Sequence, residues 1–389
     1  MNFRVYILAI VSFVVGMAEL IVGGILDIVS SGLGVSISKA GELITIYSLV
    51  FAIASPVLLT LTAKVERKRL ALITLALFFI GNIVAFLSPN FLVLFLSRMI
   101  SAASGSLLVV LCVTIGSSIV NEEFRARAIG IIFMGISGSL VLGVPVGLMI
   151  GNHFGWRFPF LFIGILTLVS MIGVTFFLEK IEPKPVISLA KQVKTLKNSK
   201  ILFAQLTSIL FLTGHLTLYA YLTPFLKSTL HLDSTWVSIF YFIFGISAVF
   251  GGGLGGFMAD KWGSKKSILT IVVIFCLVMF TLPKVTFSIT LFVIVMMVWS
   301  MLSWAITPAQ QNYLIETSPE TSDIQQSLNN SALHIGIALG SIIGGMAINH
   351  YSVQANASIG GIFVFFALLC AIFSITRGDV KASEAQQQV

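Results

Sequence analysis

Two ionisable residues interrupt segments of the chain that are otherwise apolar. Glu19 lies in the middle of the first apolar segment, in the run Gly16-Met-Ala-Glu19-Leu-Ile-Val-Gly23, and Arg98 lies in the fourth. A charge inside a bilayer is costly and usually functional. A carboxylate there can take up and release a proton, so we predict that Glu19 carries protons with Arg98 as its electrostatic partner. The alternatives are structural: a Glu19 paired for packing or helix insertion, and an Arg98 that satisfies backbone carbonyls.

Polar and aromatic side chains recur along three later apolar segments without further buried charge. Amides and flat rings suit a planar, neutral, hydrogen-bonding ligand, and we predict that five residues bind it: His215, Tyr219, Trp304, Gln311 and Asn330. The first two are four apart and share a helix face. Rings in membrane helices also serve packing or interfacial belts, which is the alternative for each residue. Two histidines can also carry protons, His215 and His334, although a packed core histidine is the simpler interpretation.

The amino-acid composition indicates which class of protein positions these groups. Of 389 residues, 57% are hydrophobic and only 10% are charged, and the mean hydropathy is +1.04. Soluble domains have roughly 45–50% apolar and about 25% charged residues. The apolar excess suits about twelve membrane spans of about 20 residues each. It excludes a soluble enzyme, a secreted disulfide scaffold and a nucleic-acid-binding domain.

Neither the cysteines nor other reactive side chains suggest an enzyme. The three cysteines, Cys112, Cys276 and Cys370, lie in apolar runs without paired or metal-ligand spacing, which indicates packing residues. No nucleophile–base group or metal cluster is visible in the sequence. We therefore predict no enzyme activity, no metal and no cofactor, with the proton as coupling ion.

Hydropathy broken at charges, Pro and Gly predicts an all-α integral membrane fold of twelve spanning helices. The apolar runs are continuous and lack the two-residue alternation of a membrane β-barrel. The first six spans are predicted at Val5–Ile25, Glu42–Thr62, Leu70–Leu87, Phe91–Ile115, Ala128–Ile150 and Phe158–Leu178. The other six are predicted at Ile201–Tyr221, Val237–Met258, Ser267–Pro283, Phe287–Pro308, Ser327–Ile348 and Ile359–Ile375.

The basic residues predict the orientation of these spans. With the N-terminus inside, 18 of the 23 Lys and Arg fall on the cytoplasmic side, four fall outside and Arg98 lies within a span. Both termini are therefore predicted to be cytoplasmic. The net charge of +8 reports topology rather than a nucleic-acid partner. The first apolar stretch is too long for a cleavable signal peptide and continues into further spans.

The chain also divides into two halves of nearly equal length. We predict a six-helix half at 1–178, a cytoplasmic linker at 179–200, a second six-helix half at 201–377 and a cytoplasmic tail at 378–389. The linker carries six Lys, two Glu and two Pro, and part of it is predicted to lie on the inner leaflet as an amphipathic helix. Two such halves indicate a duplicated transporter with its substrate site between them.

The loop between spans 8 and 9 carries a motif with specific spacing. It reads Gly256-Phe-Met-Ala-Asp260-Lys261-Trp-Gly263-Ser-Lys265-Lys266. It resembles the G-x-x-x-D-R/K-x-G-x-R/K-R/K signature of the major facilitator superfamily. We expect Gly256 to allow close helix approach, Gly263 to form a tight turn, and Asp260 to cap a helix and pair with a basic residue. Lys265 is a further member of the motif. The first-half loop lacks these glycines and the aspartate, so any charge-pair gate there must differ, with Glu66 as the candidate.

Span 5 is rich in glycine and resembles the antiporter motif of the same superfamily, G-x-x-x-G-P-x-x-G. Here Gly143, Pro145 and Gly147 carry it, with Val144 inserted before the proline. Small residues four apart let helices touch backbone to backbone. The resemblance implies export, whereas generic helix packing is the alternative.

A closer resemblance extends along nearly the whole chain. The chain is similar to twelve-span drug:proton antiporters, and most similar to purine base and nucleoside efflux pumps of the PbuE type. The similarity lies in Ala18–Leu26, Arg125–Gly135, Gly214–Phe225, Pro308–Gln311 and Asp323–Gly340. Asp27 departs from many relatives, which have Pro there, and the difference bears on the outer gate.

The resemblance implies a proton-coupled exporter of purine bases or nucleosides that works by alternating access. The expected protein is a multi-pass monomer in the bacterial inner (plasma) membrane, whose partners are a small-molecule substrate and the lipid bilayer. A first rival keeps the fold but exports drugs or sugars. A second is a membrane sensor without transport activity.

Overall fold

The computed structural model describes residues 3–121, 124–182 and 195–377, and within them every regular element is a helix. The elements of the N-terminal bundle are α1 (Arg4–Gly24), α2 (Leu26–Leu33), α3 (Ile37–Leu61), α4 (Arg67–Leu87), α5 (Phe91–Ser118), α6 (Arg125–Gly138), the π-helical turn η2 (Ser139–Gly143), α7 (Val144–Phe154) and α8 (Phe158–Phe177). Those of the C-terminal bundle are α10 (Ser199–Tyr219), α11 (Leu222–Thr229), α12 (Ser234–Trp262), α13 (Ser264–Thr281), α14 (Ile289–Thr317), α15 (Ser322–His350) and α16 (Ala355–Thr376).

Twelve helices in the described ranges are long and apolar enough to cross a membrane, with α6, η2 and α7 acting as one span. This confirms the predicted all-α, twelve-span fold. Large apolar side chains on the outside of the bundles are exposed, among them Phe176, Phe250 and Leu277. Such an apolar surface suits lipid rather than water. Of the predicted linker, residues 183–194 lie outside the described residues, as does the tail 378–389.

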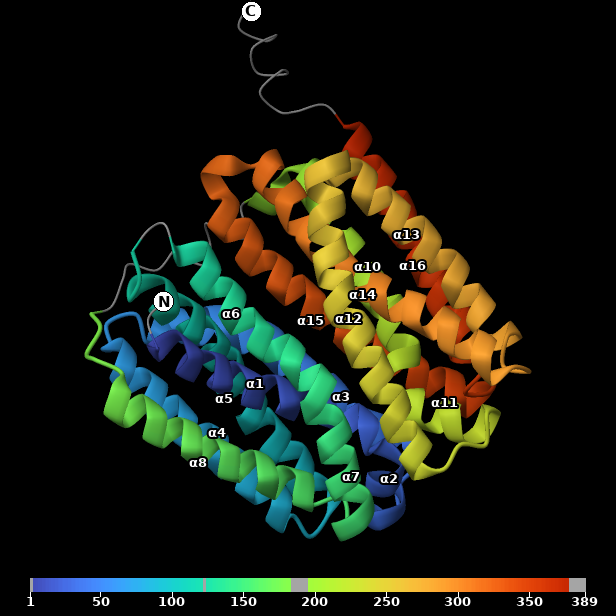
Figure 1. The fold of residues 1–389 in the computed structure, drawn as a ribbon, viewed down its shortest axis with the longest axis horizontal. Coiled ribbons are helices and arrows are strands. Elements are labelled where there is room, and N and C mark those ends of the chain that lie inside the picture. Colours follow the sequence, from blue (N-terminus) through green and yellow to red (C-terminus); the bar gives the residue numbers. More distant parts are fainter. Residues whose placement is uncertain (1–2, 122–123, 183–194, 378–389) are drawn as a thin grey trace, which may run out of the picture.

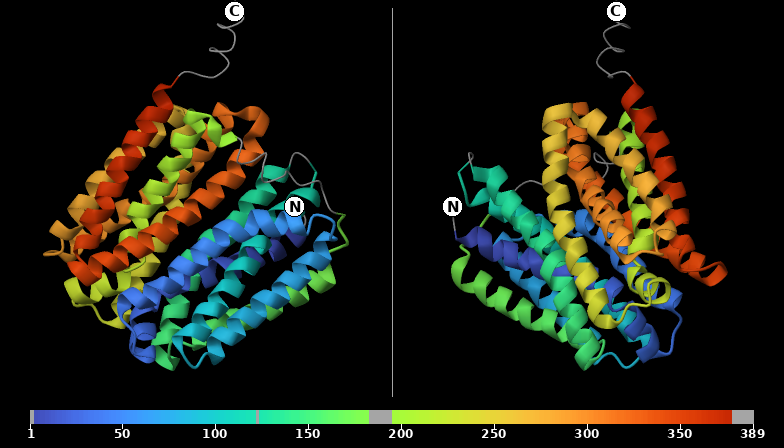
Figure 2. Two further views of the ribbon diagram at one scale, coloured as in Figure 1. Left: turned by 180° about the vertical axis from the view of Figure 1, so that it is seen from behind. Right: turned by 45° about the vertical axis from the view of Figure 1, so that its right-hand side comes forward.

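The spanning helices form two bundles that follow the chain order, coloured blue to green and yellow-green to red in Figure 1. Between the bundles, α3 packs along α15, and α12 packs against η2 and α7. Figure 2 shows that the bundles lie together at the end carrying α2 and α11 and lean apart toward the end where α1 begins and α16 ends. The two short helices α2 and α11 were not predicted from the sequence.

Proline does not end the tenth span where the sequence predicted. Helix α14 continues past Pro308 to Thr317. A proline removes one intrahelical hydrogen bond, and neighbouring helices can compensate for it in a membrane. Two residues later, Gln310 Nε2 donates to the Ala204 carbonyl of α10 at 2.7 Å and fixes the continued helix. The extension brings Gln311 onto the helix rather than into a loop.

Candidate functional site

The predicted proton carrier Glu19 lies on α1 at the boundary between the two bundles. Among the described residues, it forms one ion-pair contact, with His334 of α15, whose Nδ1 lies 3.6 Å from Glu19 Oε1. Both side chains are largely withdrawn from solvent, with 17% of Glu19 and 9% of His334 exposed. His334 also stacks on Phe51 of α3, with ring centroids 4.0 Å apart. The contact therefore joins a carboxylate of one bundle to an imidazole of the other.

Arg98 lies close to Glu19 but is held by its own bundle. Its Nη1 donates to the carbonyl of Ala18, the residue preceding Glu19, at 2.8 Å. Its guanidinium also lies over the Tyr47 ring at 4.1 Å from the centroid, within the range of a cation–π contact. Among the described residues, no ion pair joins Arg98 to Glu19. The side chain thus satisfies a backbone carbonyl, as the structural alternative expected, and it lies close to the predicted carrier Glu19.

A cluster of aromatic rings in the C-terminal bundle contains two of the predicted ligand-binding residues. His215 stacks on Tyr219 with centroids 5.3 Å apart, and it contacts Trp299 at 5.2 Å. Phe244 completes the cluster, 5.0 Å from both Tyr219 and Trp299. We call these four residues the aromatic cluster.

Three polar atoms of the aromatic cluster are buried and find no hydrogen-bond partner among the described residues: His215 Nδ1, Tyr219 Oη and Trp299 Nε1. An unsatisfied buried polar group normally costs stability, and in a native protein it often marks a site where a ligand or water binds. The aromatic cluster therefore combines stacked rings with hydrogen-bonding groups, and one of its members, Tyr219, lies within electrostatic range of the Glu19 carboxylate.

The remaining predicted ligand-binding residues lie outside this cluster. Trp304 and Gln311 of α14 and Asn330 of α15 are half-buried, and in the described part of the chain no hydrogen bond or ring contact ties them to the cluster. The tryptophan in contact with His215 is Trp299, five residues before Trp304 on the same helix. Both tryptophans lie in the same apolar run, and only the rotation of α14 against its neighbours decides which one faces α10.

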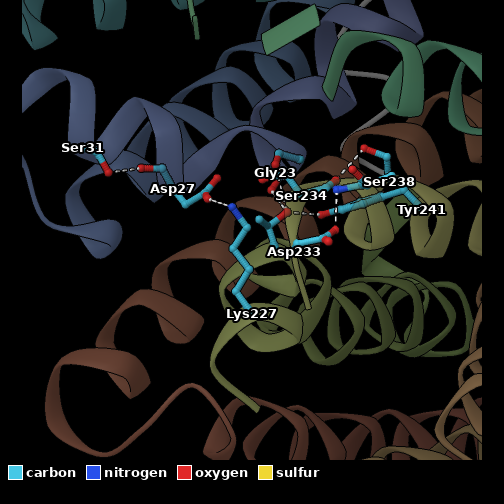
Figure 3. A network of polar contacts seen from close by, with 11 residues as sticks. Gly23, Asp27, Ser31, Lys227, Asp233, Ser234, Ser238 and Tyr241 are labelled. Atoms are coloured by element: carbon cyan, nitrogen blue, oxygen red, sulfur yellow. Dashed lines mark hydrogen bonds and ion pairs between the residues drawn. The ribbon is translucent and has the colours of Figure 1, made fainter. Parts of the chain in front are cut away.

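The end of the molecule that carries α2 and α11 is closed by contacts between the bundles. Figure 3 shows Lys227 of α11 reaching Asp27 of α2, with which it forms an ion pair. Beside it, Thr223 Oγ1 donates to the Gly24 carbonyl at 2.9 Å and lies 3.2 Å from the Tyr241 hydroxyl. Asp27, the departure noted in the sequence, thus contributes to the closure of this end.

Span 5 accommodates its inserted residue as a π-helical turn. Residues Ser139–Gly143 form η2, and the Val144 N–H bonds to the Ser139 carbonyl five residues earlier. A π-turn contains one residue more than an α-turn and often occurs at functional sites. On one side of the span, a Cβ at Gly147 would overlap the side chains of Ile21 and Met17 on α1. On the other, Gly245 of α12 packs against the η2 backbone. The motif therefore lies between the helix of Glu19 and the opposite bundle.

The loop motif after α12 behaves only partly as expected. A Cβ at Gly256 would meet open space, whereas one at Gly255 would overlap the Ala305 backbone of α14. The expectation for Gly256 was therefore wrong, and Gly255 is the close-approach residue. Gly263 forms the turn, with φ of 79°. Asp260 and Lys265 are exposed, and no ion pair links them within the described ranges.

The corresponding first-half loop uses Glu66 as a helix cap rather than as a gate between the halves. Its carboxylate accepts hydrogen bonds from the N–H groups of Lys68, Arg69 and Ile181 at 2.7–2.8 Å. Partial burial opposes ionisation, but these three donors and the nearby Lys180 hold the pKa of Glu66 below its ordinary value of 4.5. Glu66 thus fixes the start of α4 to the segment that follows α8.

Comparison with known proteins identifies the relatives of the chain. Residues 8–323 match the profile of the Major Facilitator Superfamily. The chain is 34% identical over 371 residues to the uncharacterized MFS-type transporter YbcL of Bacillus subtilis (strain 168), with 95% of both chains covered. It is 28% identical over 378 residues to the inner membrane transport protein YdhP of Escherichia coli (strain K12), with 97% of this chain and 96% of that one covered.

Solved structures share the fold at low sequence identity. A bacterial homologue of the human lysosomal transporter Spinster, in an inward-facing and unoccupied conformation, matches with a TM-score of 0.79 and 15% identity over 96% of both chains. The D-xylose–proton symporter matches with a TM-score of 0.77 and 17% identity, covering 96% of this chain and 97% of that one. These likenesses concern the fold alone.

Proposed function

The chain belongs to the Major Facilitator Superfamily and is therefore a multi-pass membrane transporter rather than an enzyme, and on that premise we propose that it is a proton-coupled exporter of purine bases or nucleosides. The observation that supports coupling is the position of Glu19. It is a carboxylate in the middle of a spanning helix, at the boundary between the bundles and facing a histidine of the other bundle. A group at this boundary changes its surroundings when the bundles rock, as alternating access requires.

The aromatic cluster supports a planar, neutral substrate. Purine bases are flat and carry several hydrogen-bond donors and acceptors, which match the ring faces and the unpartnered atoms of His215, Tyr219 and Trp299. Stacking between a base and an aromatic side chain contributes about 1–3 kcal/mol per base where proteins bind nucleobases. A sugar would use the polar atoms but gain less from the rings. The resemblance to purine efflux pumps favours the same substrate class.

The direction and orientation of transport belong to the same proposal. With both termini cytoplasmic, the end closed by Asp27 and Lys227 faces outward. The bundles then lean apart toward the cytoplasm, the side from which an exporter takes its substrate (Figure 2). The glycine-rich span 5, packed on the helix of Glu19, is the antiporter-like element.

The test is uptake of labelled hypoxanthine into inside-out vesicles with an acidic interior. Wild-type vesicles should accumulate hypoxanthine, and Glu19→Gln should lose accumulation while it retains exchange of hypoxanthine without a gradient. Flux of a dye or a sugar without purine flux would overturn the substrate assignment. Undiminished driven uptake by Glu19→Gln would instead overturn the role of Glu19.

A further inference from the structure

Coupling requires that the proton affinity of the carrier differ between the two conformations of the transporter. When two bundles rock as rigid bodies, distances within one bundle stay the same and distances between bundles change. A residue in the same bundle as Glu19 therefore sets a constant background for its protonation. A residue that makes the affinity depend on conformation must come from the opposite bundle.

Arg98 and Tyr47 belong to the constant background. Arg98 donates to the backbone of α1 at Ala18 and lies over the Tyr47 ring, so the two side chains move together with Glu19. Their charge and polarity affect Glu19 in both conformations alike. The pairing of Glu19 with Arg98 expected from the sequence therefore cannot supply the difference by itself.

His334 meets the requirement. It lies on α15 of the opposite bundle and its side chain is 9% exposed. In the part of the chain that the structure describes, its Nδ1 has no hydrogen-bond partner. The 3.6 Å separation from Glu19 Oε1 is too long for a hydrogen bond, but it is short enough for a charge interaction whenever the imidazole is protonated. Stacking on Phe51, a residue of the Glu19 bundle, holds the ring in this position only while α3 and α15 stay together.

The other titratable groups around Glu19 and His334 do not make the proton affinity of Glu19 depend on conformation in the same way. From α5 and α3 come Arg98 and Tyr47, and from α10 come Tyr219 and His215. Other titratable groups on the packed elements lie toward helix ends or in other contacts. Ion pairs hold Asp27 with Lys227, Lys39 with Glu42, and Arg4 with Glu179. Those near helix ends are Arg125 and Arg127 on α6, His153 on α7, Lys200 on α10 and His350 on α15. Hydrogen bonds link Cys112 with Ser12, Tyr313 with Ser374 and Glu316 with Ser264, and Cys370 lies on α16. Tyr219 also crosses the boundary, but a phenol carries no charge near neutral pH.

We infer that His334 is the cross-bundle partner of Glu19, a positioning residue that makes proton uptake by Glu19 depend on whether the two bundles are together at α3 and α15. This inference rests on the proposed proton coupling and adds the residue that links the proton to the conformation. While the bundles are together, the imidazole of His334 lies beside the carboxylate of Glu19 and affects its proton affinity. Once α15 leaves α3, Glu19 keeps only Arg98 and Tyr47.

The test measures Glu19 directly, without substrate. Infrared difference spectra of the protein in lipid nanodiscs, recorded against pH, report the carboxylic acid C=O band, and the band lost in Glu19→Gln belongs to Glu19. His334→Gln should move the pH midpoint of this band by about one unit, the size expected when a charged neighbour is removed. A second variant, His334→Lys, places a fixed cation there and should also move the midpoint.

Ser331→Ala is the matched control. Ser331 precedes His334 by three residues on α15 and donates to the Ala52 carbonyl of the opposite bundle at 3.0 Å, but it has no titratable group. This variant removes one neutral hydrogen bond and no charge, so it should leave the midpoint within about 0.3 units, less than the shift expected from a charged neighbour. An unchanged midpoint in both His334 variants, with normal thermal stability, would overturn the inference.

Transport separates this inference from the proposed function. In the vesicle assay, His334→Gln should retain hypoxanthine exchange and lose most gradient-driven accumulation. If wild type carries no purine but the infrared midpoint moves in the His334 variants, the pairing stands and the substrate assignment fails. If purine accumulation stays fully coupled in His334→Gln, the inference fails while the proposed function stands.

Discussion

Lys227 on α11 pairs with Asp27 on α2, joining the two bundles through residues 200 positions apart in the sequence. The pair is partly exposed, with 30% and 20% of the side chains accessible. An ion pair of this kind contributes about 1 kcal/mol, and less at high salt. Its effect is to favour the conformation in which the α2–α11 end is closed.

Neutralising this pair should shift the protein toward the conformation open at that end. We expect Asp27→Asn to raise the open population about fivefold, the equivalent of about 1 kcal/mol. Spin labels at the exposed Ser31 and Ser228 of a cysteine-free variant would report the change as a longer interlabel distance. The charge swap Asp27→Lys with Lys227→Asp should restore the short distance. The same distances in all variants would show that the pair has no influence on closure.

The packing of span 5 against α1 predicts a contrast between two glycines of α6. A Cβ at Gly135 would overlap the Ala9 carbonyl, whereas one at Gly130 meets nothing within 4 Å. Gly135→Ala should lower stability by about 1–3 kcal/mol through overpacking. Gly130→Ala should be neutral, or stabilising by up to about 1 kcal/mol, since alanine favours helix. Thermal unfolding in detergent compares the two, and equal effects would contradict the close contact of α6 and α1.

Gly255 and Gly256 form a second matched pair, at the loop motif. Only Gly255 packs against the backbone of α14, at Ala305. Gly255→Ala should destabilise the protein by about 1–3 kcal/mol, and Gly256→Ala should not. Fluorescence-detected thermal stability of the two variants, purified in parallel, would decide. The reverse order would restore the interpretation of Gly256 that the sequence motif suggested.

The hydrogen bonds of the Glu66 carboxylate predict a contribution to stability that is lost at acid pH. Because the folded state lowers its pKa, the carboxylate stabilises the protein fully above its ordinary pKa of 4.5, and this contribution is lost as pH falls through the lowered folded value. The difference in melting temperature between wild type and Glu66→Gln should therefore be constant at neutral pH and shrink on acidification below about 4.5. The exposed Glu182 provides the control variant Glu182→Gln. If the difference in melting temperature does not change with pH, the negative charge of Glu66 does not contribute to its hydrogen bonds with the backbone N–H groups.

The aromatic cluster predicts which tryptophan binds substrate. Trp299→Phe keeps a ring but removes the unpartnered Nε1–H, and should weaken hypoxanthine binding about tenfold, the cost of a lost hydrogen bond of about 1.4 kcal/mol. Trp304→Phe should change the affinity little, because Trp304 lies outside the cluster. Binding of labelled hypoxanthine to purified protein measures both. A larger loss of hypoxanthine affinity in Trp304→Phe than in Trp299→Phe would indicate that the substrate site lies further along α14.

The sequence reveals the spans because lipid imposes a simple rule: each crossing needs a long apolar helix whose backbone bonds itself. The same rule makes Glu19 and Arg98 conspicuous, since charge in such a segment is rare. The helix ends were predicted less accurately: α14 runs on past Pro308, and Gln310, two residues further on, donates to the Ala204 carbonyl of α10. The loop and span-5 patterns identified the family, but not which glycine of a pair touches a neighbour.

By itself, then, the sequence determined the class of molecule, its twelve spans and the presence of a carboxylate inside the first one. The tertiary structure decided the partners. It holds Arg98 on the α1 backbone, places His334 across the bundle boundary from Glu19, and turns Trp299 rather than Trp304 toward His215. These pairings join residues from distant segments, and they depend on how each helix is rotated and placed against its neighbours. Hydropathy does not record that rotation, because lipid and a packed helix face are both apolar.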